Sequence, residues 1–62
     1  MKTLVCLIDD LDTPVIVHVG AIVQIQPAEA FKTTRSVIRF VDGSKMTVKI
    51  SLNELYIVIT GQ

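Results

Sequence analysis

Cysteine and histidine are almost absent from this sequence, and each occurs only once, as Cys6 and His18. A single cysteine cannot form a disulfide within the chain. Zinc sites draw four ligands mainly from cysteine and histidine, so one residue of each does not supply a site. We therefore expect no metal, and a thiol that stays reduced, as is typical of cytoplasmic proteins.

Net charge and long apolar runs are also lacking. Six Lys and Arg residues balance six Asp and Glu residues, so the overall charge indicates neither a nucleic acid nor a membrane surface. No run approaches the roughly 18 apolar residues of a membrane-spanning helix. The apolar run near the start is too short for a signal peptide, and Asp9 and Asp10 follow it at once. We expect no membrane span and a cytoplasmic location.

The chain lacks the motifs that carry reactions. Its three glycines are isolated, so no phosphate-binding loop is present. His18 has no partner at the spacing that would orient an imidazole for catalysis. Asp10 and Asp12 have the spacing of a carboxylate pair, but no glycine or distal glutamate follows in the register of a calcium loop. We predict that the protein is not an enzyme and has no catalytic residue, cofactor or small-molecule substrate.

Aliphatic residues are what the chain has in excess. Half of its 62 residues are hydrophobic and only 5% are aromatic, and the mean hydropathy is +0.56. A chain of this length forms a single domain, residues 1–62, and one so short buries only about 60% of its unfolded surface. We predict that it does not hide all this apolar surface alone, and that it works as a homo-oligomer or against a protein partner.

Valine and isoleucine gather in short runs, which favours strands. The runs cover residues 3–8, 15–19, 21–26, 35–41 and 45–50. The segment from Asp9 to Pro14 between the first two has turn composition. The pattern predicts a mainly β fold, either a small SH3-like barrel or a curled antiparallel sheet of about five strands.

The hairpin around Asp42 and Gly43 is the best-specified element. A two-residue loop would pair Phe40 with Lys45 and mix the polar and apolar faces of the two arms. A three-residue loop, 41–43, pairs Phe40 with Ser44 and keeps the faces separate. It also places Gly43 in the left-handed position that closes a type I turn with a G1 bulge.

The last segment allows two interpretations. Ser51 and Glu54 have the spacing of a capping box, which starts helices, whereas residues 56–60 are five consecutive residues that favour strands. In the first interpretation residues 51–55 form one turn and residues 56–60 are a final barrel strand. In the second, residues 52–59 form a C-terminal helix on an antiparallel sheet, an α+β fold. We favour the barrel and keep the helix as the alternative.

One face of the hairpin gathers basic residues. Because side chains alternate between the two faces along each arm, four basic residues and one threonine lie on the side opposite Phe40. They are Arg35, Arg39, Lys45, Thr47 and Lys49. A positive ribbon is suited to phosphate, but single-strand binders add stacking aromatics, and this face has none. A charged outer face also keeps a sheet soluble. We interpret the face first as solvated, then as a contact for a protein, and last as a contact for nucleic acid.

Between Val15 and Ile59 the order of short motifs is also informative. They are Ile22–Ile25, Pro27, Ser36–Phe40, Asp42-Gly43 and Val48–Glu54. This order resembles the FlbD family of small bacterial flagellum-associated proteins, although the short Asn-Gly turn near the start of that family is replaced here by residues 9–14. The same stretch is similar to the first half of LytTR-type DNA-binding domains, and the half that contacts DNA is missing. Both resemblances imply a non-enzymatic protein, and the first implies a regulatory or accessory role through protein contact.

The sequence thus predicts a non-enzymatic protein-interaction or regulatory module that acts through its surface as a homo-oligomer. The alternative is a small nucleic-acid-binding protein that uses the basic hairpin face.

Overall fold

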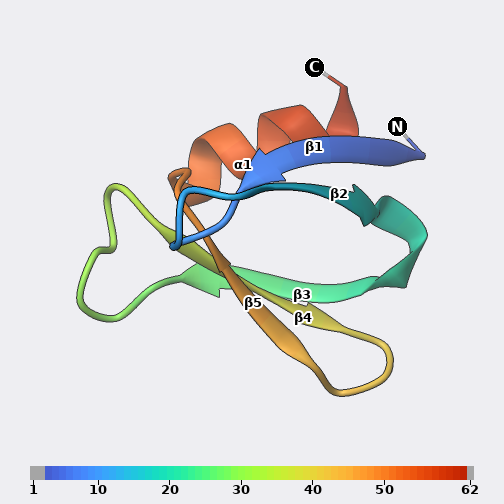
Figure 1. Cartoon of the computed structure of the whole chain (residues 1–62), viewed down its shortest axis with the longest axis horizontal. Coiled ribbons are helices and arrows are strands. Elements are labelled where there is room, and N and C mark those ends of the chain that lie inside the picture. The colour runs from blue at the N-terminus through green and yellow to red at the C-terminus, as the bar shows by residue number, and fades with distance from the viewer. Residues whose placement is uncertain (1–2, 62) are drawn as a thin grey trace.

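The computed structural model describes residues 3–61, which form five strands, one 3₁₀ turn and one helix (Figure 1). The elements are β1 (Leu4–Ile8), β2 (Pro14–His18), η1 (Val19–Ala21), β3 (Ile22–Pro27), β4 (Ser36–Phe40), β5 (Lys45–Val48) and α1 (Leu52–Thr60). The prediction of a mainly β fold with about five strands is confirmed.

The strands form two antiparallel sheets, and backbone hydrogen bonds join the two sheets at one junction. β1 and β2 make a hairpin, and β3, β4 and β5 make a three-stranded meander. The sheets join where β1 ends, because the Lys49 N–H donates to the Ile8 carbonyl at 2.8 Å and Asp9 bridges to Val48. Among residues 3–61 this junction and the turn η1 connect the two layers, and no closed barrel forms.

The β4–β5 hairpin has the predicted register. Ile38 pairs with Met46 and Ser36 with Val48, and the Phe40 N–H donates to the Ser44 carbonyl at 2.9 Å. Gly43 adopts φ +90°, the left-handed conformation that glycine enters without a steric penalty. The three-residue loop is therefore confirmed, and with it the separation of an apolar face from a polar one.

Residues 52–60 are helical, so the final strand that the barrel interpretation requires at residues 56–60 is wrong and the helical alternative is confirmed. Ser51 caps the start, since its hydroxyl accepts from the Glu54 N–H at 3.3 Å, and Gly61 ends the helix at φ +76°. Strand-favouring residues lose only tenths of a kcal/mol each in a helix. Burying one large aliphatic side chain recovers about 1.5–3 kcal/mol, and Leu55 is buried completely.

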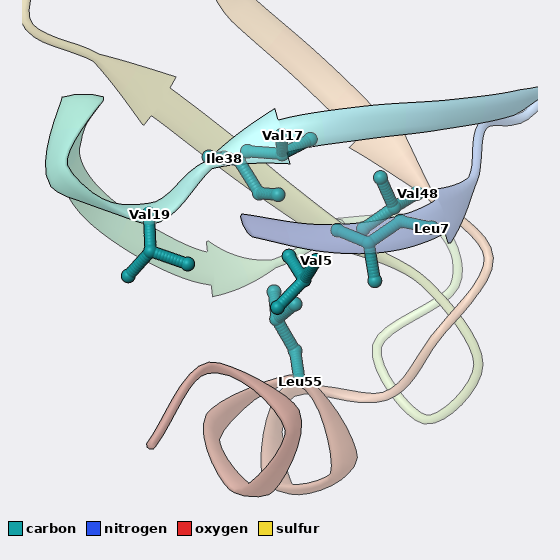
Figure 2. Packing of buried hydrophobic residues seen from close by; sticks show 7 residues of the cluster. All are labelled: Val5, Leu7, Val17, Val19, Ile38, Val48 and Leu55. Atoms are coloured by element: carbon teal, nitrogen blue, oxygen red, sulfur yellow. The ribbon is translucent and has the colours of Figure 1, made fainter. Parts of the chain in front are cut away.

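The hydrophobic core lies between the two sheets and is closed by the helix (Figure 2). Leu55 of α1 reaches toward Val5 of β1 in this view. The buried members come from every layer: Val5, Leu7, Val17, Val19, Ile38, Val48 and Leu55. In each sheet, alternate side chains along the strands therefore face the core, and the side chains between them form the outer surface.

Candidate binding faces

The outer side of the three-stranded sheet carries the basic residues that the sequence singles out. Arg39 of β4 lies directly opposite Lys45 of β5, and Val37 lies opposite Thr47. Gln24 of β3 pairs with Arg39 on the same sheet. The structure thus brings Arg39, Lys45 and Thr47 together as predicted. Two like charges in directly opposite positions repel each other unless an anion or a solvent shell lies between them.

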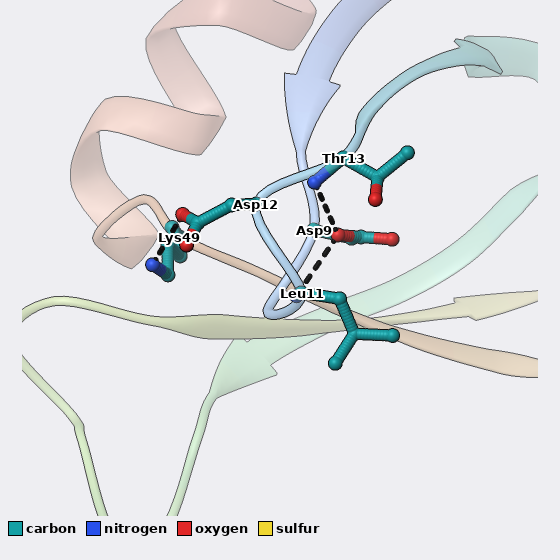
Figure 3. Close-up of polar contacts among 5 residues, drawn as sticks. All are labelled: Asp9, Leu11, Asp12, Thr13 and Lys49. Atoms are coloured by element: carbon teal, nitrogen blue, oxygen red, sulfur yellow. Dashed lines mark hydrogen bonds and ion pairs between the residues drawn. The ribbon is translucent and has the colours of Figure 1, made fainter.

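The other two basic residues of this face are already engaged. The Lys49 ammonium donates to the Asp12 carboxylate, an ion pair between residues 37 positions apart in the chain (Figure 3). The Arg35 guanidinium lies over the Phe31 ring, 4.6 Å from its centroid, a cation–π contact. The basic face is therefore divided into an exposed Arg39–Lys45 pair and two cations with partners inside the molecule.

The Lys49 contact sets the protonation of Asp12. The hydrogen bond from Lys49, then its positive charge, and last the charge of Arg35, lower the pKa of the Asp12 carboxyl. A lowered folded-state pKa adds stability above the unfolded value of about 3.9, and this contribution is lost as pH falls through the folded value. We expect Lys49→Met to raise the pKa of Asp12 toward its ordinary value in a carboxyl-carbon NMR titration.

Asp42 provides the matched control for that titration. The pKa of Asp42 is lowered by hydrogen bonds from Ser44, so we expect Lys49→Met to leave this pKa unchanged. If Asp12 titrates at the same pH with and without Lys49, the ion pair does not form in solution.

The acidic segment before β2 is a hydrogen-bonded turn. The Asp9 carboxylate accepts from the backbone N–H groups of Leu11 and Thr13, each at 2.9 Å (Figure 3). Asp12 adopts φ +63°, a left-handed conformation that aspartate tolerates better than most residues. These carboxylates are occupied by the loop itself and by Lys49. Within residues 3–61 no group of His, Cys, Asp and Glu side chains is placed to hold a metal ion.

His18 and Cys6 have no catalytic geometry around them in the described residues. The His18 Nδ1 accepts from the Gly20 N–H at 3.1 Å and so caps the turn η1. Cys6 is exposed on β1 and lies opposite Ile16 of β2. Cys6 is thus a surface residue, although its apolar neighbours in the sequence favour burial.

A second face, which the sequence reasoning missed, lies on the outer side of the β1–β2 hairpin. We define the outer hairpin face as Leu4, Cys6, Ile8 and Ile16. Leu4 is 55% exposed, Ile8 43% and Ile16 72%, and none of the four residues is charged. The sequence contains a signal for this face. In a sheet with one solvent-facing side, apolar and polar side chains usually alternate along each strand, whereas residues 4–8 and 15–17 are apolar at every position.

A shallow hollow of about 400 Å³ lies at the start of α1. Its lining includes Lys32, Thr33, Ser51 and Asn53. The Ser51 hydroxyl already accepts from the helix N-terminus, and Glu54 adds a negative charge in the first turn. Because anions bind to helix N-terminal N–H groups that are free, this arrangement does not favour an anion.

No helix in residues 3–61 is long and apolar enough to cross a membrane. No family model matches the chain, and neither a search of curated proteins nor a search of solved structures finds a match.

Proposed function

We propose that this protein is a non-enzymatic interaction module that associates with itself and contacts a protein partner. The observation that carries the proposal is the outer hairpin face, where Leu4, Ile8 and Ile16 project from one small sheet with large exposed fractions. Contiguous apolar patches on small proteins mark interaction sites more often than isolated exposed residues do. The resemblance to FlbD-like proteins supports a regulatory or accessory role, carried out in the cytoplasm.

Static light scattering on the purified full chain tests the self-association. A monomer has a mass of 6.8 kDa, and we expect the measured mass to rise toward twice that value with increasing concentration. Raising the salt concentration should strengthen the association or leave it unchanged, because burial of apolar surface is not screened. A mass of 6.8 kDa at all concentrations up to about 1 mM overturns the proposal of self-association.

A second candidate function uses the Arg39–Lys45 pair. Two cations in opposite positions on exposed strands offer a site for phosphate oxygens, and nucleic acid supplies them at regular spacing. Lys49 and Arg35 contribute less to this site, because Asp12 and Phe31 hold them. This candidate therefore has weaker support than the first.

Fluorescence anisotropy with labelled single- and double-stranded DNA and RNA separates the two functions. The nucleic-acid candidate requires binding that weakens steeply with salt and disappears in an Arg39→Glu/Lys45→Glu variant. The matched control is Lys32→Glu, a charge change away from the β4–β5 hairpin. No binding at low salt eliminates this candidate and leaves the first one intact.

A further inference from the structure

Strand β2 forms a free edge. At the two ends of the β1–β2 hairpin the Val19 N–H donates to the Thr3 carbonyl and the Asp9 N–H donates to the Thr13 carbonyl. Hydrogen-bonded pairs alternate along an antiparallel ladder, so the odd-numbered residues of β2 bond to β1. Within residues 3–61, β1 is the only strand paired with β2. The N–H and C=O groups of Ile16 and the N–H group of His18 therefore point away from the molecule, whereas the His18 carbonyl begins the turn η1.

Each of the two sheets has two edge strands. β1 and β5 meet each other at the Asp9–Val48 bridge, so β2 and β3 are the two outer strands. These two strands differ in how they resist pairing with another chain. β3, at the other end of the strand order, has a register shift between Ile22 and Gln24, ends at Pro27, and is contacted by α1. Bulges, prolines and covering elements are the devices that blunt an exposed edge. β2 also has a proline at one end, Pro14, but it carries no charged residue and no bulge, and it is not covered by α1. β2 is thus the less protected of the two edges.

We propose that β2 pairs antiparallel with β2 of a second copy of this chain, about a two-fold axis at Ile16. In this register the Ile16 N–H and C=O bond reciprocally to those of the second Ile16. The His18 N–H donates to the Pro14 carbonyl of the other copy. The missing N–H of Pro14 costs no hydrogen bond, because the His18 carbonyl that lies opposite it already begins η1. The inference rests on the self-association proposed above and names its surface.

A second copy suits this edge better than an unrelated strand, for reasons of symmetry and charge. Two-fold dimers pair the same patch on both subunits, and a strand that meets itself antiparallel satisfies this condition without any rearrangement. β2 contains no Asp, Glu, Lys or Arg, so pairing with a second β2 brings no like charges together across the axis. Pairing also joins the two outer hairpin faces into one four-stranded surface, which doubles the apolar area presented to a protein partner.

The contact is small, which sets the expected affinity. Edge-to-edge pairing engages one five-residue strand per copy, Pro14–His18, and leaves the outer hairpin face exposed beside it. Stable interfaces bury about 800 Å² per partner, and smaller ones are transient. We therefore expect a dimer that dissociates on dilution into the micromolar range.

The proposed register fixes two distances that oxidation can report. Residues in a hydrogen-bonded antiparallel pair have Cα atoms about 5.5 Å apart, within the range of about 4.4–6.8 Å that a disulfide spans. A cysteine at position 16 is therefore placed to crosslink to its equivalent. The native Cys6 thiols lie three strand spacings apart, about 14 Å, and are not. Face-to-face packing of two outer hairpin faces would instead bring the Cys6 thiols together.

The test compares three full-length proteins under mild oxidation, over a series of concentrations. They are the unmodified chain, Cys6→Ser/Ile16→Cys, and Cys6→Ser/Val23→Cys, in which the new thiol lies on β3. Ile16 is 72% and Val23 61% exposed, so both variants are expected to fold. We expect the Ile16→Cys protein to form a covalent dimer at least tenfold faster than the other two. In the unmodified chain, we expect hydrogen exchange at the Ile16 amide to slow as the protein concentration rises.

Three outcomes overturn the inference. Equal crosslinking at positions 16 and 23, or faster crosslinking through Cys6, places the contact elsewhere. If light scattering of the Cys6→Ser chain still shows a dimer in those cases, the self-association stands and only the β2 edge is rejected. A monomer at every concentration rejects both.

Discussion

Leu55→Ala is expected to unfold much of the protein. Leu55 is fully buried and is the one residue of α1 in the buried core cluster, and it reaches between the sheets toward Val5 (Figure 2). Replacing a buried leucine by alanine lowers the free energy of unfolding by about 2–5 kcal/mol, because transfer free energy is lost and a cavity remains. Chains of this size have little more stability than that to lose.

Leu11→Ala is the matched control, because it makes the same chemical change at a side chain that is 80% exposed. We expect it to change the free energy of unfolding by less than about 0.5 kcal/mol. Thermal melts followed by circular dichroism measure both variants, and the Leu55 variant should melt about 10–30 °C lower than the unmodified chain. Similar melting temperatures for the two variants would mean that α1 does not close the core.

Ser36→Ala is expected to have the second largest effect. Ser36 is fully buried in β4, and its hydroxyl donates to the Ile50 carbonyl at 2.7 Å. This bond fixes the connection between β5 and α1 to the middle strand of the meander. Removing the hydroxyl leaves the carbonyl without this donor, which costs about 1–3 kcal/mol in a buried site.

The control for Ser36 is Ser44→Ala, which removes an exposed hydroxyl that donates to Asp42 two residues away. We expect this variant to lose less than about 0.5 kcal/mol. Urea unfolding at constant temperature gives both values with the same m-value, since neither change alters the surface exposed on unfolding. An equal loss from both serines contradicts the role assigned to the Ser36 bond.

The parts of the fold that the sequence predicts correctly are the local ones. The β4–β5 hairpin follows from the alternation of apolar and polar residues along its two arms and from the glycine at position 43. This prediction needs no information from outside residues 36–48. The helix start at Ser51 is likewise visible as a capping box. The choice between helix and strand for residues 56–60 is not local, because it depends on the burial of Leu55 against β1 and β3, where tertiary packing overrides propensity.

The binding faces show the same division. Strand parity correctly places Arg39, Lys45 and Thr47 on one side of the sheet. It cannot reveal that Lys49 bonds to Asp12, because that contact joins residues 37 positions apart. The outer hairpin face was recognisable as an excess of apolar residues, but which parity of β1 and β2 faces the core is decided only when the second sheet packs against them.

Light scattering of Ile16→Lys tests most directly the proposal that the protein associates with itself through the β1–β2 hairpin. A lysine at this exposed edge position sets two like charges opposite each other across the proposed two-fold axis. We expect the unmodified chain and the control Val23→Lys to approach twice 6.8 kDa at high concentration, and Ile16→Lys to remain at 6.8 kDa. A dimer of Ile16→Lys with the affinity of the unmodified chain contradicts the claim.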